Sequence, residues 1–392
     1  MGKAAGLLPS WYWPEGVQRY VSAPPIALDE LCVGRWARRY GGNVALQGQQ
    51  GQLTFRELNE RVGRIAGAIL ARWGDAPRLA LYAGEPLLWA TAFFAGARLG
   101  CQLLLLDTDL PLDAQGWALE SFRPTAVLDD VAVHNLQEAQ GPTPAGRRPD
   151  ASAPVIALPE GKALVYHSHV SLASGAMALA AFLQLDPQEK VVAVSPWGRW
   201  EGLLTLLAHL QGGGTALASP SSWEALSEAV AHHRPKALWV PASLGWHVLE
   251  EKSLREAVRR ARPWLLMGVE GPVAKAQRRR WRRLLGTHVL TAYGFAATGV
   301  IAASHPSWYL DEAVGIPMTG VDLIPIDPAS RAPVEAPWEV LTYAGIGVRT
   351  RALAPRIEGE GPYYGLIAPD LFYTGRQGWM DPNGMLYLLD GR

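Results

Sequence analysis

The chain has 392 residues with 36 basic and 36 acidic side chains, so its formal net charge at pH 7 is zero. Hydrophobic residues make up 49% of the sequence and charged residues 18%, which excludes a disordered chain and is typical of a globular protein with more than one core. A balanced charge gives no global attraction to nucleic acid or to an anionic membrane, so either partner would need a local charged patch, and we expect no nucleic acid.

Cysteine usage and the N-terminal segment favour a cytoplasmic protein. Cys32 and Cys101 are far apart and form no CxxC spacing, so neither a disulfide framework nor a zinc site is predicted. Pro9 and Pro14 interrupt the N-terminal segment before the apolar region of a signal peptide could form. No stretch approaches the ~18 consecutive apolar residues of a membrane span, so no integral membrane segment is expected.

The first half of the chain alternates between predicted strands and helices. A helix is predicted over residues 54–73, because Thr54 and Glu57 have capping-box spacing and apolar residues recur at helical intervals. The elements expected next are a strand at 78–84, a helix at 85–100, a strand at 101–107, and a helix and strand within 114–130. This alternation predicts a mostly parallel sheet with helices on its faces.

A stretch rich in Pro, Gly and Ala, residues 139–154, predicts a surface connection between two halves. The second half repeats the alternation, with strands expected at 190–196, 215–220, 237–243, 264–271 and 288–294 and helices at 201–214 and 222–234. After about Ala302 short apolar runs punctuated by Pro and Gly predict a small antiparallel β region, with strands at 320–327, 338–345, 371–381 and 384–392.

Several short segments occur along the chain in an order that is known from one protein family. They are LTFRELNERV, FFAGARLGCQLLLLDTDLP, HSHVSL, SPWGRWEGL, MGVEGP, AYGFAATG, AVGIPMTGVDLIPID and YTGRQGWMDPNGMLYLLDGR. Together they resemble the large N-terminal domain of adenylate-forming enzymes, the superfamily of acyl-CoA synthetases, luciferases and peptide-synthetase adenylation domains. The resemblance implies an α/β fold of two flavodoxin-like subdomains with mostly parallel sheets plus a small distorted β-barrel. We place these parts at residues 1–165, 166–302 and 303–392.

The resemblance also implies a chemistry. Enzymes of this superfamily join a carboxylate to the α-phosphate of ATP with loss of pyrophosphate, and then pass the acyl-adenylate to a thiol. That reaction requires donors for the triphosphate, a carboxylate for Mg²⁺, an acceptor for the ribose hydroxyls and a lysine on the transferring phosphate.

The family's phosphate loop is a Ser/Thr/Gly-rich stretch before a Pro-Lys pair, and it wraps the β- and γ-phosphates. Here the corresponding positions are Pro159, Glu160, Gly161 and Lys162. Proline removes a backbone donor, glutamate places a negative charge where phosphates would sit, and no hydroxyl remains. We therefore expect a plain hairpin turn that joins two strands at this place.

Three other positions depart from the family pattern. Ala296 and Ala297 replace two polar residues of the family's Tyr-Gly-x-Thr-Glu turn, and the methyl of Ala297 cannot ligate Mg²⁺. Arg376, which can only donate hydrogen bonds, replaces the aspartate that holds the ribose. Arg392 matches the hinge arginine that precedes the family's C-terminal lid, and we expect the lid and its catalytic lysine to be absent. Each loss would remove about 3 kcal/mol or more of transition-state stabilisation.

A remnant of the nucleotide or acyl pocket is still expected. Trp197, Arg199 and Trp200 stand where the family's aromatic–His pair lines the acyl pocket, and they either fill or reshape it, with filling favoured. Tyr293 and Gly294 could stack on a ring or line the same pocket. The remnant positions are Trp197, Arg199, Trp200, Gly268, Glu270, Tyr293, Gly294 and Arg392.

Two further groups of residues could bind a ligand or a partner. His167 and His169 lie on one face of an extended segment and could bind a metal, but no third ligand is obvious, so we favour a structural role and predict no metal site. Residues 274–286 carry six basic side chains around Trp281 and could dock an acidic carrier protein, a CoA phosphate or a membrane surface. The favoured alternative is a solvated helix face with Leu284 and Leu285 buried.

The leading hypothesis is a catalytically degenerate, lid-less acyl-CoA synthetase-like protein that binds a ligand or acts as a scaffold subunit in acyl, fatty-acid or secondary metabolism. Neither ATP nor Mg²⁺ is expected as a cofactor, and no catalytic residue is assigned. Its expected partners are an acyl or other small-molecule ligand, a protein partner or carrier protein, or a second copy in a homodimer. The alternatives are an acid–thiol ligase completed by a separate lid chain and a purely structural partner of an active paralogue.

Overall fold

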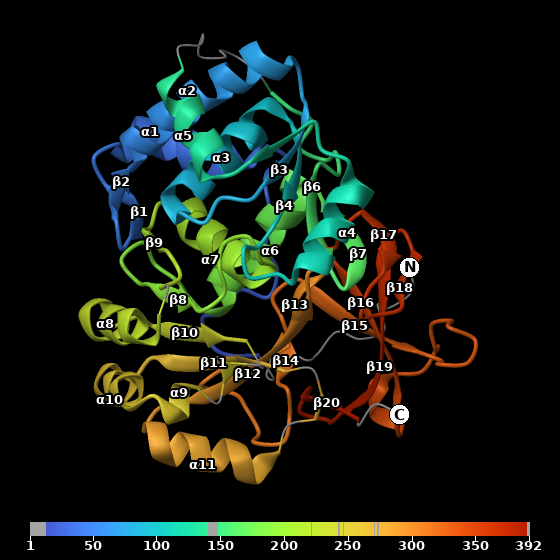
Figure 1. Ribbon diagram of the computed structural model, residues 1–392. Helices are drawn as coiled ribbons and strands as arrows, with labels where there is room; N and C mark the ends of the chain where they lie inside the picture. Colours follow the sequence, from blue (N-terminus) through green and yellow to red (C-terminus); the bar gives the residue numbers. More distant parts are fainter. Residues whose placement is uncertain are drawn as a thin grey trace.

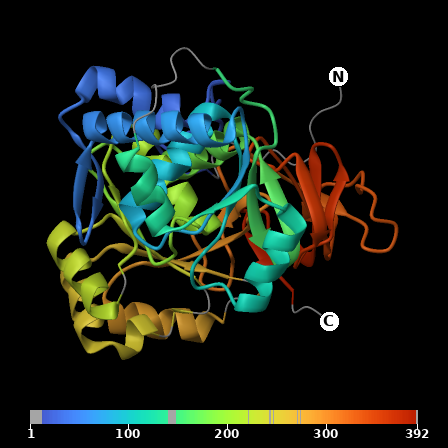
Figure 2. The ribbon, with the colours of Figure 1, turned by 45° about the horizontal axis from the view of Figure 1, so that its top comes forward.

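The computed structural model describes residues 13–139, 148–220, 222–241, 244–245, 247–269, 271–272 and 274–389. Two α/β layers lie one above the other, and an antiparallel sheet near the C-terminus lies beside them (Figures 1 and 2). This arrangement confirms the predicted mixed α/β fold with mostly parallel sheets. Glu270, Arg392 and residues 140–147 of the predicted surface connection lie outside the described residues.

The first large sheet has the strand order β17-β7-β6-β4-β3-β5. Its strands are β3 (Arg78–Leu81), β4 (Gln102–Leu105), β5 (Ala126–Leu128), β6 (Ile156–Glu160), β7 (Lys162–His167) and β17 (Arg356–Glu360). The pairs among β3, β4, β5 and β6 are parallel, whereas β7 and β17 run antiparallel to their neighbours. Its helices are α2 (Phe55–Trp73), α3 (Pro86–Leu99), α4 (Leu112–Phe122) and α5 (Asp130–Glu138).

The predicted capping box at the start of α2 is confirmed. The Thr54 hydroxyl accepts a hydrogen bond from the Glu57 backbone N–H at 3.2 Å, and the Glu57 carboxylate accepts one from the Thr54 backbone N–H at 2.8 Å. These bonds satisfy donors that a helix N-terminus otherwise leaves unpaired. The apolar stripe that follows, including Leu58, Val62 and Ile65, is buried in the core.

The second large sheet has the order β14-β13-β12-β11-β10-β8. Its strands are β8 (Val191–Ala193), β10 (Ala237–Val240), β11 (Trp264–Gly268), β12 (Val289–Phe295), β13 (Gly299–Ala303) and β14 (Ile316–Pro317). The first four are parallel and the last two are antiparallel. Helices α6 (His169–Phe182) and α7 (Trp200–Gln211) lie between the two layers, and α8 (Trp223–His233), α9 (His247–Glu250), α10 (Lys252–Ala261) and α11 (Lys275–Leu285) lie at the lower side of Figure 1.

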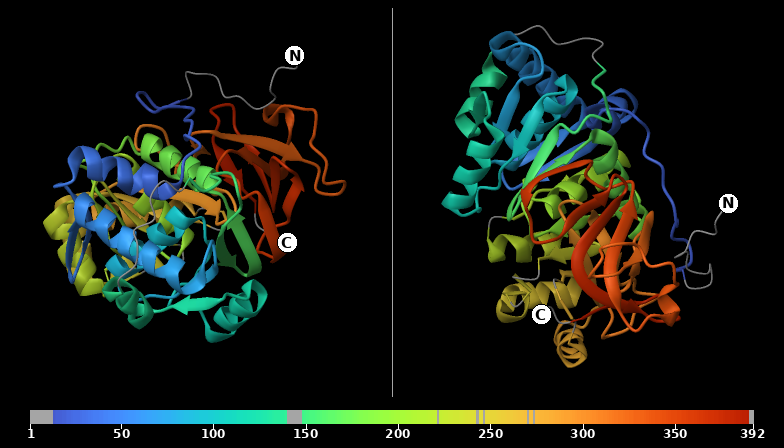
Figure 3. Two further views of the ribbon diagram at one scale, coloured as in Figure 1. Left: turned by 90° about the horizontal axis from the view of Figure 1, so that it is seen from above. Right: turned by 90° about the vertical axis from the view of Figure 1, so that its right-hand side faces the viewer.

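The third sheet is antiparallel, as predicted for the C-terminal part. Its order is β15-β16-β19-β18, and β20 pairs with β19. The strands are β15 (Val321–Ile326), β16 (Ala344–Thr350), β18 (Gly365–Ala368), β19 (Leu371–Met380) and β20 (Leu386–Leu388). Figure 3 shows this sheet standing beside the α/β layers.

One predicted strand is wrong. Residues 338–345 were expected to be extended, but Trp338–Val340 form a 3₁₀ helix and β16 begins only at Ala344. The buried Trp338 indole donates a hydrogen bond to the Leu323 carbonyl at 3.0 Å. This contact with the neighbouring β15 holds Trp338 in a turn, a tertiary effect that the apolar run alone does not reveal.

Three strands pair across the predicted domain boundaries. A small sheet of order β2-β1-β9 joins β1 (Val44–Gly48) and β2 (Gly51–Thr54) to β9 (Ala216–Leu217). From the C-terminal part, β17 is an edge strand of the first sheet and β14 is an edge strand of the second. The short π-helix Glu30–Gly34 and α1 (Arg35–Tyr40) precede β1. The division into three parts stays a prediction.

Both cysteines are buried and free, as the spacing predicts. Among the described residues, no helix combines the length and apolar character needed to cross a bilayer.

Candidate functional site

A cavity of about 270 Å³ lies at the carboxyl ends of three parallel strands, β10, β11 and β12. Such strand ends are the usual place for ligands in open α/β sheets. The lining residues are Glu160, Arg199, Trp200, Glu201, Trp239, Pro241, Gly268, Val269, Ala292, Tyr293, Gly294, Phe295, Pro362 and Arg376. The structure thus brings together seven of the predicted site residues: Glu160, Arg199, Trp200, Gly268, Tyr293, Gly294 and Arg376.

The predicted hairpin at the phosphate-loop position is confirmed. Strands β6 and β7 pair directly, with Glu160 opposite Ala163. Gly161 has a φ of +63°, in the left-handed region that glycine adopts without strain. Lys162 is exposed and starts β7 rather than lining the cavity. The turn therefore offers no loop long enough to surround a triphosphate.

Glu160 reaches from this hairpin to the turn at residues 292–299. Its Oε1 accepts a hydrogen bond from the Ala296 backbone N–H at 2.8 Å. The pKa of Glu160 is raised to about 7, mainly because the side chain is buried. The negative charge of Glu201 also raises this pKa, whereas the hydrogen bond from the Ala296 N–H lowers it. The Glu160 carboxylate is thus hydrogen-bonded to the Ala296 N–H, a backbone donor beside the cavity.

The turn between β12 and β13 is held through its backbone groups, which bond to side chains and backbone of other segments. The carbonyl of Ala296 lies 2.7 Å from His167 Nε2, and the carbonyl of Ala297 accepts a hydrogen bond from the Ala354 N–H at 2.8 Å. Both alanine side chains are buried, and neither lines the cavity. A Cβ at Gly294 would lie 2.2 Å from the Gly299 carbonyl oxygen, so only glycine fits there. The turn therefore connects three segments of the chain.

His167 and His169 have separate structural partners, as favoured from the sequence. His167 Nδ1 lies 3.0 Å from the Ser171 hydroxyl, and because the Ala296 carbonyl can only accept, Nε2 carries the proton. His169 Nδ1 accepts a bond from the Leu28 N–H at 3.4 Å. Burial lowers the pKa of each to about 4, so both are neutral at pH 7. Within the described residues no cluster of three His, Cys, Asp or Glu could hold a metal.

Aromatic rings form the walls of the cavity. Trp200 and Trp239 make an edge contact with ring centroids 5.7 Å apart, and Tyr293 and Phe295 make another at 5.4 Å. Trp200 lines the cavity, and the expectation that it fills part of the acyl pocket stays a prediction. Trp197 is buried and lines a separate cavity of about 540 Å³, so it is not part of this site.

Two arginines border the cavity in different ways. Arg199 forms an ion pair with the buried Asp107 at the end of β4. Arg376 follows Gly375, whose φ is +72°, and its backbone N–H donates to the Thr374 hydroxyl at 3.1 Å. Burial raises the pKa of Tyr293, and the Arg376 charge opposes this rise. Arg376 thus acts at the Tyr293 end of the cavity.

Sequence reasoning missed several lining residues, chiefly Glu201, Trp239 and Phe295. Trp239 lies in β10, a predicted strand, so the rule that ligands bind at the carboxyl ends of parallel strands could have indicated it. Glu201 follows the predicted Trp200 directly, but its role depends on the facing Glu160, which no local pattern reveals.

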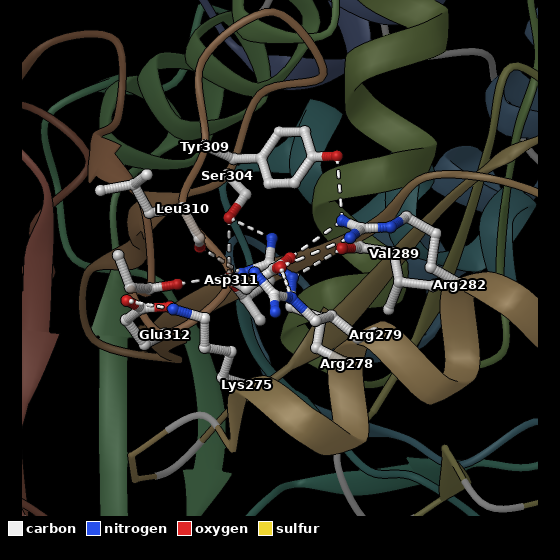
Figure 4. A network of polar contacts seen from close by, with 12 residues as sticks. Lys275, Arg278, Arg279, Arg282, Val289, Ser304, Tyr309, Leu310, Asp311 and Glu312 are labelled. Carbon is white, nitrogen blue, oxygen red and sulfur yellow. Dashed lines mark hydrogen bonds and ion pairs between the residues drawn. The ribbon is translucent and has the colours of Figure 1, made fainter.

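The basic segment forms helix α11, and its arginines serve the fold (Figure 4). Arg278, expected on a solvated face, is only 2% exposed and donates to the carbonyls of Val289, Leu310 and Ala313 and to the Ser304 hydroxyl at 2.7–3.1 Å. Burial lowers its pKa to about 10, so it stays charged at pH 7. The expectation that Leu284 is buried is wrong, because it is 42% exposed, whereas Leu285 is buried.

Other cations of α11 pair with acidic side chains of the loop before β14. Arg279 and Arg282 contact Asp311 at 2.7 and 2.8 Å, and Lys275 contacts Glu312 at 3.0 Å. Arg278 and these pairs attach the loop to the helix. Less positive charge is therefore left for an acidic partner than the sequence indicates.

The family profile "AMP-binding enzyme" matches residues 33–158 and 162–345. This match covers most of the chain, and the protein belongs to the AMP-binding enzyme family. The interruption at residues 159–161 coincides with the hairpin that carries Glu160.

Solved structures of CoA ligases, and the structure of VinN, share the fold. The anthranilate CoA ligase AuaEII in complex with anthranoyl-AMP matches 93% of this chain and 77% of its own at 14% identity, with a TM-score of 0.80. O-succinylbenzoate CoA synthetase from Bacillus subtilis, in complex with ATP and magnesium, matches 94% of this chain and 79% of its own. The sequence identity is 18% and the TM-score is 0.77. VinN matches 95% of this chain and 100% of its own at 15% identity, with a TM-score of 0.77. None of the curated protein sequences compared shows significant similarity to this chain.

Proposed function

We propose that this protein binds a small aromatic molecule at the former nucleotide–acyl site and does not itself form acyl-adenylates. The observation that carries the proposal is the hydrogen bond from the Ala296 N–H to the Glu160 carboxylate. An internal carboxylate occupies a backbone donor where the family fold places the anionic part of its nucleotide. A triphosphate at this place would meet like charge in a partly desolvated cavity, which is strongly unfavourable.

The residues around the cavity fit Mg-ATP poorly. The β6–β7 turn has neither the length nor the hydroxyl groups to surround phosphates. The side chain at position 297 is a buried methyl, which offers Mg²⁺ no oxygen. Arg376 lines the cavity as a donor-only group where the family's ribose hydroxyls need an acceptor. The residues of this cavity therefore support no reaction step through ATP or Mg²⁺.

The size and lining of the cavity support a small ring as ligand. Its 270 Å³ is below the ~300–1,000 Å³ of drug-sized pockets, so one ring with a short chain fits better than a long acyl chain. The aromatic walls favour stacking and edge contacts with a planar group. Two structural neighbours are a benzoate CoA ligase and an anthranilate CoA ligase, whose names denote aromatic acids. We therefore favour aromatic secondary metabolism over fatty-acid metabolism.

A pyrophosphate-release assay tests the lack of ligase activity. The full chain is mixed with Mg-ATP, CoA and benzoate or anthranilate. We expect no pyrophosphate above the background without enzyme. Release that depends on acid and enzyme concentration would overturn the proposal.

The alternative function is an acid–thiol ligase completed by a separate lid chain. The observation in its favour is that Gly268, Tyr293 and Gly294 remain together at the cavity. Adding candidate lid chains to the same assay distinguishes the two, because only the alternative predicts release that requires both chains. A role as a scaffold, a partner of a carrier protein or a homodimer remains part of the proposal, and co-purification tests it.

A further inference from the structure

The parallel strands of the second sheet begin at an edge opposite the cavity, and backbone contacts join their first residues. The Lys236 N–H donates to the Lys190 carbonyl at 2.8 Å, and the Trp264 N–H donates to the Lys236 carbonyl at 2.8 Å. The Thr287 hydroxyl donates to the Pro263 carbonyl at 2.6 Å, just before β12. Because α8, α10 and α11 directly precede β10, β11 and β12, the last turns of these helices meet at this edge (Figure 1).

Five cations lie along this edge, and we call them the basic edge: Lys190, Arg234, Arg259, Arg262 and Arg283. Lys190 precedes β8 and is half-buried, whereas the four arginines are exposed. Arg234 and Arg262 directly follow α8 and α10, while Arg259 and Arg283 lie in the last turns of α10 and α11. Neighbouring elements thus contribute a row of positive charges.

The acidic side chains near the basic edge do not neutralise it. The ion pairs nearby are Glu189–Lys236, Asp311–Arg279, Asp311–Arg282 and Glu256–Arg260. Among the described residues, none of the five cations of the basic edge forms an ion pair. Two other acids lie near, Asp186, which accepts a hydrogen bond from the Gln188 N–H at 2.7 Å, and Glu228 in the middle of α8. The edge therefore keeps an excess of positive charge.

Two of these arginines have a backbone conformation that favours glycine. Arg234 and Arg262 end α8 and α10 with φ of +44° and +54°, in the left-handed region. Glycine is the usual residue at such a helix end, and Gly286 occupies it in α11 with a φ of +66°. The helix dipole favours a cation nearby, but in α10 Arg259 already supplies one in the last turn. The local structure thus gives little reason for arginine at these two positions.

The spacing of the basic edge fits carboxylates on one face of a helix. Neighbouring strands are ~4.8 Å apart, so cations at successive strand starts are separated by about that distance. Side chains four residues apart on a helix are ~5–6 Å apart, which is nearly the same repeat. A guanidinium also matches a carboxylate through two parallel hydrogen bonds. Charge and spacing therefore favour the same partner.

We propose that the basic edge docks a partner protein through a helix that carries Asp or Glu along one face. The surface lies at the amino ends of β10, β11 and β12, whereas the cavity lies at their carboxyl ends. Docking therefore leaves the cavity open, and the inference holds whether or not the cavity binds a nucleotide.

The test compares two alanine-rich helical peptides of about 20 residues and identical composition, titrated with the full chain. In the first peptide, glutamates four residues apart lie on one face; in the second they are spread around the helix. Fluorescence anisotropy at about 50 mM salt measures binding. We expect the first peptide to bind about fivefold more tightly and to lose affinity as salt is added. Equal affinity of the two peptides, or no saturable binding of the first, would overturn the inference.

Variants separate docking from folding. Arg234→Gly and Arg262→Gly together should lower the affinity for the first peptide about fivefold, while the Tm stays equal or rises because glycine suits both positions. Arg123→Gly is the matched control, since Arg123 is exposed and ends α4 at a φ of +53° on the first sheet. Arg283→Glu, which leaves both left-handed positions unaltered, should also lower the affinity. Unchanged affinity in these basic-edge variants, or an equal loss in Arg123→Gly, would contradict docking at this edge.

Two further probes distinguish the class of partner. Double-stranded RNA and vesicles of phosphatidylserine with phosphatidylcholine are titrated at the same salt concentration. We expect both to bind more weakly than the first peptide. Tighter binding of either probe, with the same loss in the Arg234→Gly, Arg262→Gly chain, would overturn the assignment to an acidic protein helix.

Discussion

The carboxylate of Glu160 accepts a hydrogen bond from the backbone N–H of Ala296 at 2.8 Å, although the two residues are 136 positions apart in the chain. The bond links the hairpin of the first sheet to the turn between β12 and β13 of the second. It places a carboxyl group beside the cavity, which carries a negative charge above about pH 7, and it holds the turn in place. We therefore expect the stability of the fold and the choice of ligand to depend on the same side chain.

Glu160 should make stability fall as the pH rises. Its pKa is raised from an ordinary 4.5 to about 7, so the folded protein retains a proton that the unfolded chain releases between these values. Its contribution is present below pH 4.5 and is lost as the pH rises through 7. Between pH 5 and pH 8 this group should lower the free energy of unfolding by roughly 2–3 kcal/mol.

Urea denaturation of the unaltered chain and of Glu160→Gln at pH 5, 6, 7 and 8 measures this effect. The difference between the two proteins isolates Glu160 from other titrating groups, such as His167, whose pKa is lowered to about 4. The facing Glu201 and Tyr363 are retained in both proteins. A difference that does not change with pH would show that Glu160 is not protonated in the folded state.

Arg278 should be the most important arginine of α11 for stability. Arg278→Ala would leave the carbonyls of Val289, Leu310 and Ala313 without their donor. Each unsatisfied buried group costs ~1–3 kcal/mol, so we expect a loss of about 3 kcal/mol or more. Arg280→Ala, on an exposed position of the same helix, should change stability by less than ~0.5 kcal/mol. Similar losses for both variants in thermal denaturation would refute the buried role.

Gly294 should tolerate no side chain. In Gly294→Ala the added Cβ would be 2.2 Å from the Gly299 carbonyl oxygen, so β12 and β13 would have to separate. We expect a loss of about 3 kcal/mol or an insoluble protein. Gly116→Ala is the control, because Gly116 lies in α4 with open space around its Cα, and this change should stabilise by ~0.5–1 kcal/mol. Stability of Gly294→Ala equal to that of the unaltered chain would contradict the account of the turn.

Local sequence patterns predicted the helices, strands and turns. They did not predict the contacts between segments that are far apart in the sequence. The capping box at Thr54 and the hairpin at Gly161 follow from residues close in sequence, and both are confirmed. Trp338 was misassigned because its turn depends on a hydrogen bond to Leu323 in another strand. Arg278 was expected in solvent because no local pattern shows that the loop before β14 covers it.

The sequence predicted which residues line the cavity better than it predicted how these residues contact one another. Motif order identified Glu160 and Arg376 as departures from the family, and the structure places both at one cavity. The sequence did not show that Glu160 bonds to Ala296 or faces Glu201, since these residues meet only through the packing of two sheets. Trp197 was misplaced because neighbours in sequence can point into different cavities.

Calorimetric titration of the full chain with ATP, with and without Mg²⁺, tests the central claim most directly. With Glu160 on the Ala296 N–H and a methyl at position 297, the account predicts no saturable, magnesium-dependent heat at millimolar nucleotide. Saturable binding that requires Mg²⁺ would contradict it, because the cavity would then accommodate the anion that its carboxylates should repel.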